Sequence, residues 1–254
     1  MTTMTDRMGA LGRAELTLLV RNRYALFVAL GMPLLMVGFM RSSLDQVGLE
    51  KTGMSALEAS LSGGIVMALL LVVYLNLVSA YVARREELVL KRLRTGEASD
   101  REILAGTALP AAVLAVAQCA LMVAAGTAFL DVRAPQRPDL LVLGTVLGVV
   151  LLTGLAAATA GFTRTVESAQ ITTMPLFVVT SIGSGLFLPL EVFPEKVASV
   201  CELLPLTGVM TLVRAGWLGG GDAGELAGAA ATALVWIAVS VFAVRRWFRW
   251  EPRR

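Results

Sequence analysis

The residues best suited to chemistry lie in one interval, 84–102, which holds eleven of the chain's 22 basic and 19 acidic residues. A lipid-modifying transferase would need a cluster of polar catalytic side chains near one membrane interface, and Asp100, Arg101 and Glu102 are the candidates for it here. Their pattern does not resemble a metal-binding aspartate motif. Enzymatic chemistry is therefore the weaker interpretation of this interval.

The same interval also contains apolar residues that need a surface to lie against. Leu88, Leu90 and Leu93 are too few to form a core of their own, and charged residues surround them. Such a segment lies either on a membrane surface or against a partner protein. The identity of that partner is the main question that the sequence raises.

Long apolar stretches flank this interval. The chain has 254 residues, of which 56% are hydrophobic and only 16% are charged, whereas soluble domains carry about 25% charged residues. A helix needs about 20 apolar residues to cross a bilayer. We therefore expect an all-α integral membrane protein with one transmembrane domain over residues 1–254. Its six predicted spans are 24–40, 62–83, 103–130, 140–162, 171–193 and 223–244.

The distribution of lysine and arginine predicts the orientation of these spans. With the amino terminus inside, the inner segments hold sixteen of these residues and the outer loops hold six. This excess predicts that both termini and the interval 84–102 are cytoplasmic, in a plasma-membrane protein. Residues 7–21 are predicted to form an interfacial amphipathic helix. A plain cytoplasmic tail is an equally good interpretation of that segment.

Missing residue types exclude several functions. The chain has no histidine, which excludes Ser–His proteases and histidine-ligated metal or haem sites. Cys119 and Cys201 form no metal-binding motif, so no metal site is expected. The sequence also lacks the phosphate-binding pattern GxxxxGK[ST]. If ATP drives this protein, another polypeptide must bind it.

The predicted spans contain small and mildly polar residues. Gly144 and Gly148 are spaced for close helix packing, as are Gly224 and Gly228. We expect them to pack within the bundle, with a dimer seam as the alternative. Polar residues at membrane depth also predict a translocation path, although hydrogen bonds within or between helices would explain them too. The candidates for the path are Asn76, Gln118, Thr173 and Thr180.

The connection between the fifth and sixth predicted spans is apolar but repeatedly interrupted. Pro189, Pro194 and Pro205 break any helix there, and the pieces between them are too short to cross a bilayer. An ordinary exposed loop would not carry so much leucine, valine and phenylalanine. We expect re-entrant or interfacial helices on the outer face, which require protein around their ends.

Together these two segments resemble the membrane subunit of ABC-2-type exporters. In that family the cytoplasmic stretch typically reads E-x-G-T-L-x-x-L, and residues 86–93 follow it except that Leu88 and Val89 replace the Gly-Thr pair. The outer segment resembles the family's F-x-P-x-x-x-x-P and P-L-T patterns through Phe187, Pro189, Pro194 and 205–207. The resemblance covers nearly the whole chain.

The resemblance implies that the segment 84–102 docks into a groove on a separate ATP-binding subunit, which would hold the ATP and Mg. The three leucines would act as apolar anchors, and charged side chains would form the rim that sets the register. The outer segment would act as a gate, and a second permease copy, identical or different, would complete the pore. The rim residues are Glu86, Glu87, Lys91, Arg92 and Arg94, and the gate residues are Phe187, Pro189, Pro194, Pro205 and Arg214.

The implied activity is export of an amphipathic or hydrophobic substrate, most often a drug or antibiotic in small members of the family. Lipid or polysaccharide export on the same scaffold is the alternative. An ion-driven carrier would show broken helices in corresponding positions of both halves. Here the breaks lie in one connection only, which argues against that class.

Overall fold

The computed structural model describes residues 56–95, 99–129, 132–187 and 190–251, together with the single positions 31 and 35. Every element in these ranges is helical. Apart from positions 31 and 35, the predicted first span lies outside the described residues. The predicted amphipathic helix at 7–21 also lies outside them.

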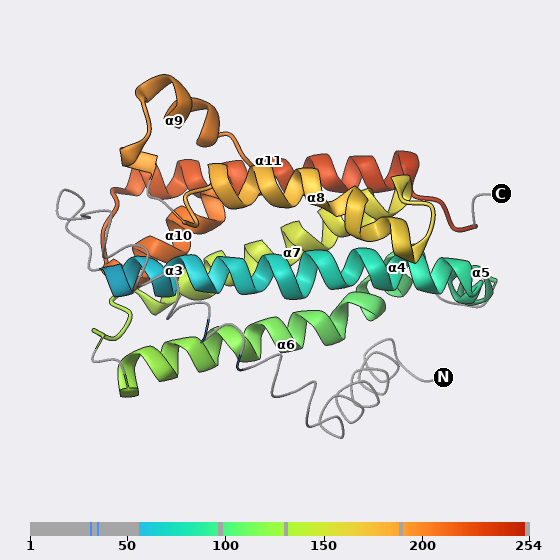
Figure 1. Ribbon diagram of the computed structural model, residues 1–254, viewed down its shortest axis with the longest axis horizontal. Coiled ribbons are helices and arrows are strands. Elements are labelled where there is room, and N and C mark those ends of the chain that lie inside the picture. Colours follow the sequence, from blue (N-terminus) through green and yellow to red (C-terminus); the bar gives the residue numbers. More distant parts are fainter. Residues whose placement is uncertain are drawn as a thin grey trace.

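Most of the described chain forms long helices that run side by side along the long axis of the molecule (Figure 1). A π-helical segment, η2, joins α3 to α4 without a break. The long elements are α3 Ala56–Leu69, η2 Leu70–Leu75, α4 Asn76–Glu86, α6 Asp100–Phe129, α7 Pro138–Phe162, α8 Val166–Gly183 and α11 Ala223–Trp247. The short elements are α5 Val89–Arg94, η3 Leu190–Val192, α9 Glu195–Cys201 and α10 Thr207–Leu218.

Four helical stretches in the described residues are long and apolar enough to cross a membrane. They coincide with the second, third, fourth and sixth predicted spans. The helix that corresponds to the third predicted span, α6, continues through Pro110 without a break. The four stretches are Leu57–Glu86, Asp100–Ala128, Pro138–Phe162 and Ala223–Trp247.

The predicted fifth span, 171–193, is wrong at its carboxyl end. α8 begins earlier, at Val166, because Thr165 and Ser168 cap it reciprocally. It ends at Gly183, and Gly185 follows with a φ of 75°. Glycine adopts this left-handed conformation readily, so the chain turns before it reaches the predicted end of the span.

α10 lies inside the bundle and depends on glycine to approach its neighbours. Gly144 and Gly148 of α7 face it, and a Cβ on Gly148 would lie 3.0 Å from Cγ1 of Val209. The predicted packing role of this pair within the bundle is therefore confirmed. The same prediction is wrong for Gly228, because a Cβ there would meet nothing within 4 Å. Along α11, glycine spacing alone does not mark a packed face.

Candidate functional site

The predicted docking segment forms a separate short helix at one end of the bundle. α4 ends at Glu86, and α5 begins at Val89 after a break at Leu88. Figure 1 shows α5 at the opposite end of the molecule from α9. The two segments that carried the family resemblance are therefore separated by the length of the bundle, as predicted for the two sides of a membrane.

The break between α4 and α5 rests on an unusual backbone conformation. Leu88 has φ 60° and ψ 13°, and it alone among the described non-glycine residues has a positive φ. A left-handed conformation costs an L-residue roughly 1–2 kcal/mol, whereas glycine adopts it freely. This is the position at which the exporter pattern has glycine. In this chain Leu88 adopts the left-handed conformation, although leucine is poorly suited to it.

Replacing Leu88 with glycine is therefore expected to stabilise the turn by about 1 kcal/mol. Slower amide exchange over 89–95 in the purified chain would show this. Leu93→Gly is the matched control, because it places glycine inside α5 and is expected to speed exchange there. Faster exchange in Leu88→Gly than in the unaltered chain would contradict the assignment of strain.

The three predicted apolar anchors do not behave alike. Leu88 and Leu93 are 40% and 43% exposed, whereas Leu90 is completely buried. Leu90 therefore holds α5 against the bundle, and its burial corrects the expectation that all three leucines are available to a partner. The exposed apolar surface consists of Leu88 and Leu93. All five predicted rim residues are exposed around them.

Ion pairs fix part of this rim. Nε of Arg94 lies 3.1 Å from Oδ1 of Asp100, at the start of α6. Nζ of Lys91 lies 2.9 Å from Oε1 of Glu251, beyond the end of α11.

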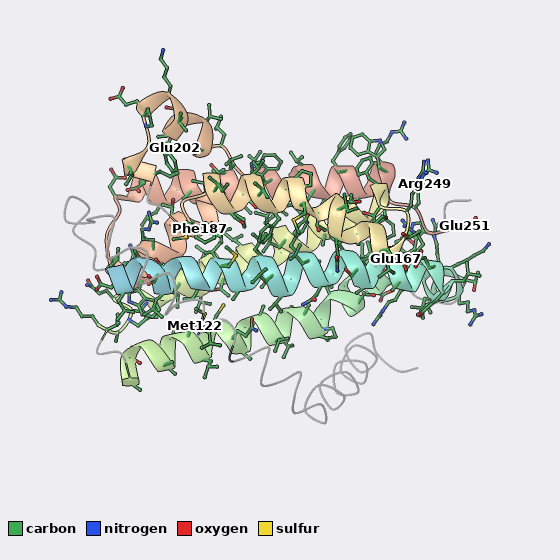
Figure 2. The ribbon with its side chains drawn as sticks, in the orientation of Figure 1. Met122, Glu167, Phe187, Glu202, Arg249 and Glu251 are labelled. Atoms are coloured by element: carbon green, nitrogen blue, oxygen red, sulfur yellow. The ribbon has the colours of Figure 1, made fainter. Side chains whose placement is uncertain are left out.

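Glu167 also lies at this end of the molecule (Figure 2). Hydrogen bonds from its own backbone N–H and from the Thr165 side chain lower the pKa of the Glu167 carboxyl.

The carboxylates that suggested an enzyme serve the start of α6. Asp100 pairs with Arg94, and Oε2 of Glu102 accepts the backbone N–H of Ser99 at 2.6 Å. These are a salt bridge and a helix cap. Among the described residues, no group of three or more histidine, cysteine, aspartate or glutamate side chains is placed to hold a metal ion.

Arg85 is the important residue that sequence reasoning did not single out. It is only 1% exposed, although it belongs to the charged interval. Its Nη1 donates to the carbonyl oxygen of Ala160 at 2.8 Å, and its Nη2 donates to those of Thr163 at 2.5 Å and Arg164 at 3.3 Å. These carbonyls lie in the last turn of α7 and just after it, where a helix lacks internal partners and favours a cation. Arg85 therefore ties α4, and the turn that follows it, to α7.

At the opposite end, the predicted prolines separate short helices. Pro194 is the N-cap of α9, and α10 begins two residues after Pro205. The turn after α8 leaves Phe187 40% exposed, while Pro189 lies outside the described residues. Nη2 of Arg214 donates to the carbonyl oxygen of Gly185 at 3.0 Å, which joins α10 to this turn.

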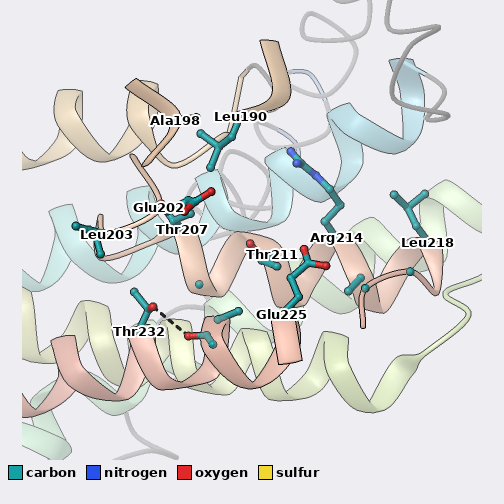
Figure 3. Close-up of a pocket in the computed structure, with 16 residues that line it drawn as sticks. Leu190, Ala198, Glu202, Leu203, Thr207, Thr211, Arg214, Leu218, Glu225 and Thr232 are labelled. Atoms are coloured by element: carbon teal, nitrogen blue, oxygen red, sulfur yellow. Dashed lines mark hydrogen bonds between the residues drawn. The ribbon is translucent and has the colours of Figure 1, made fainter. Parts of the chain in front are cut away.

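A cavity of about 670 Å³ lies between α9, α10 and the start of α11. Arg214, Glu202 and Glu225 bring charges of both signs to its wall, and Figure 3 shows threonine side chains between them. Its polar part is formed by side chains of the predicted gate segment together with α11. A cavity of this size, with a few polar groups in an otherwise apolar wall, can receive a small molecule or a headgroup.

The four predicted path residues fall into two groups. Gln118, Thr173 and Thr180 are buried within the chain. The two threonine hydroxyls donate to carbonyls of their own helix, at Ala169 and Leu176, which is the alternative explanation that the sequence left open. Asn76 is exposed, and it directly follows the π-helical segment η2. Such segments often occur at functional sites, and the path role of Asn76 stays a prediction.

Comparison with known proteins agrees with this arrangement. The model of the ABC-2 type transporter family matches residues 7–218 of the chain. The matched region includes α5, Arg85 and the gate segment up to the end of α10. No protein of curated function matches the chain significantly.

Proposed function

Because the chain belongs to the ABC-2 type transporter family, we propose that it is the permease subunit of an exporter driven by a separate ATP-binding subunit. Membership makes it a membrane subunit of a transporter, and its four long apolar helices agree with that class. The proposal adds the partner, the surface on which the partner docks and the direction of transport.

The observation that carries the proposal is the exposed surface of α5. Leu88 and Leu93 present apolar side chains beside exposed charges at one end of the bundle. A pair of apolar anchors inside a polar rim has the character of a protein interface. Buried Leu90 and Arg85 hold this surface on the bundle, so force applied to α5 is transmitted to α4 and α7.

For the cargo, we propose an amphipathic or hydrophobic compound, with drug or antibiotic efflux as the leading function. α6 ends at Phe129 and α7 begins at Pro138, so the connection between them leaves little room for a domain that captures substrate. A cargo that enters from the membrane needs no such domain. Export of a lipid or a lipid-linked polysaccharide is the second candidate, and the charged side chains in the wall of the cavity, Arg214 among them, would suit its headgroup.

The orientation and assembly follow from this proposal. α5 and both termini lie in the cytoplasm, α9 and the cavity face outward, and ATP with Mg is bound by the partner. Six spans in the plasma membrane, with 24–40 as the first, complete the topology. Two permease copies, identical or different, form the path, and opposed movement of their α5 helices opens it outward.

The proposal predicts that replacing Leu93 with serine prevents stable association with the ATP-binding subunit, because one of two exposed anchors is lost. Affinity is expected to fall about tenfold or more, as for a central interface residue. The measurement is co-purification, followed by titration of the two purified subunits. Glu87→Gln tests the rim in the same assay.

Leu203→Ser is the matched control for Leu93→Ser. Leu203 is an exposed leucine two residues after α9, at the opposite end of the molecule from α5 (Figure 1), and its replacement is expected to leave the affinity unchanged. The proposal fails if the unaltered chain binds no ATP-binding subunit. It also fails if Leu93→Ser and Leu203→Ser bind equally well.

A further inference from the structure

The carboxyl-terminal segment 248–251 lies against α5, which is the docking helix of the proposed function. α11 ends at Trp247, and Phe248 continues in an extended conformation with φ −66° and ψ 128°. Figure 2 shows Arg249 and Glu251 at the end of the molecule that carries α5. The family match ends at residue 218, so it assigns no role to this segment.

Two side chains of α5 contact the segment directly. The Lys91–Glu251 ion pair is one contact. In the other, the guanidinium of Arg94 lies 5.0 Å from the centroid of the Trp250 ring. A cation at this distance over an indole face is attracted by the ring quadrupole. Because Arg94 also pairs with Asp100 of α6, its side chain is held from two sides.

Aromatic rings connect these contacts to the core. The rings of Phe248 and Trp250 pack edge-on, with centroids 5.0 Å apart. Phe248 packs in the same way against Tyr81 of α4, at 6.3 Å. Tyr81 is buried, and its hydroxyl donates to the carbonyl oxygen of Leu104 at 3.0 Å. Trp250 is therefore anchored to the bundle on one side and contacts α5 on the other.

Each contact is individually weak because these side chains are partly solvent-exposed. Their importance comes from the size of α5, which has six residues and is too short to be stable alone. Contacts at its surface therefore decide how often α5 detaches from the bundle. Leu90 supplies the buried contact, and Trp250 contacts Arg94, the last residue of the helix.

We propose that the segment 248–251 is a positioning element for α5, with Trp250 as its main positioning residue. It links the docking helix directly to the last membrane helix, so movement of α5 is passed to α11 as well as to α4 and α6. The coupling part of this inference rests on the proposed function. The positioning part concerns only this chain.

The positioning part is tested by hydrogen exchange on the purified full chain without a partner. Trp250→Ala is expected to raise amide exchange over 89–95 about 5- to 10-fold, because α5 loses one of its supports. Trp250→Tyr restores most of the protection. Trp247→Ala is the matched control, since that ring packs against Phe162 and Phe242 instead. Equal exchange in Trp250→Ala and the unaltered chain overturns the inference.

The coupling part is tested by titration with the ATP-binding subunit. Trp250→Ala is expected to weaken binding about 5- to 10-fold, because the docking-competent position of α5 is less populated, while Trp247→Ala binds normally. Unchanged affinity alongside faster exchange overturns the coupling part alone. If the unaltered chain binds no ATP-binding subunit, the proposed function fails, and the exchange experiment still decides the positioning role.

Discussion

Replacing Arg85 with methionine is expected to lower the free energy of unfolding by about 3 kcal/mol, because several buried carbonyl groups at the end of α7 lose their charged donor. Methionine keeps much of the apolar stem, so the loss is mainly one of hydrogen bonds to Ala160 and Thr163. The measurement is equilibrium unfolding in detergent, followed by tryptophan fluorescence.

Arg92→Met is the control for this experiment. Arg92 belongs to the same charged interval but is exposed on α5, and surface substitutions of this kind usually change stability by less than about 0.5 kcal/mol. Arg85→Lys keeps the charge but cannot reproduce the planar donor geometry, so an intermediate loss is expected. If Arg85→Met and Arg92→Met unfold alike, Arg85 does not tie α4 to α7.

Replacing Gly208 with alanine is expected to destabilise the bundle by about 3 kcal/mol and to abolish transport. A Cβ at this position would overlap the carbonyl oxygen of Ala229 on α11, where α10 and α11 cross backbone to backbone. Because no flexible side chain can move aside, the helices must separate, which is the costly form of overpacking. Unfolding of the purified chain and transport by the complex are the two measurements.

Gly228→Ala provides a control of opposite sign on α11. Its Cβ would meet nothing within 4 Å, and alanine is favoured over glycine inside a helix by about 1 kcal/mol. This variant is expected to be as stable as the unaltered chain or more stable. Equal destabilisation by both substitutions would show that the close crossing of α10 and α11 is not as described.

Apolar length and proline predicted much of the architecture. The coincidence of four apolar stretches with predicted spans reflects the demand that a bilayer makes on any helix that crosses it. Pro194 and Pro205 marked the separation of α9 from its neighbours because proline removes a backbone donor. These signals are local, so a single sequence contains them.

The features that the sequence did not predict depend on contacts between residues distant in the sequence. Arg84 and Arg85 are neighbouring arginines that the sequence alone does not distinguish. Arg85 is buried because the end of α7, 75 residues away, presents unsatisfied carbonyls to it. Leu90 is buried for a similar reason, while Leu93 of the same helix is exposed. The early end of α8 depended on a backbone conformation at Gly185, which spacing alone does not reveal.

The different environments of the aromatic residues near the carboxyl end were also not predictable from the sequence. The sequence of 245–250 is typical of an aromatic and basic anchor at the membrane interface. In the structure, Trp247 and Trp250 separate into different environments, one beside Phe162 and Phe242 and one over Arg94. The extended conformation of Phe248 makes this separation possible, because it turns the chain out of α11.

The central claim, that the exposed face of α5 docks on an ATP-binding subunit, is tested most directly by photo-crosslinking from within the assembled transporter. A photoreactive amino acid at position 93 is expected to crosslink to the ATP-binding subunit, whereas one at position 203, at the opposite end of the bundle, is expected not to. A co-purifying complex that crosslinks from 203, or that fails to crosslink from 93, would contradict the claim.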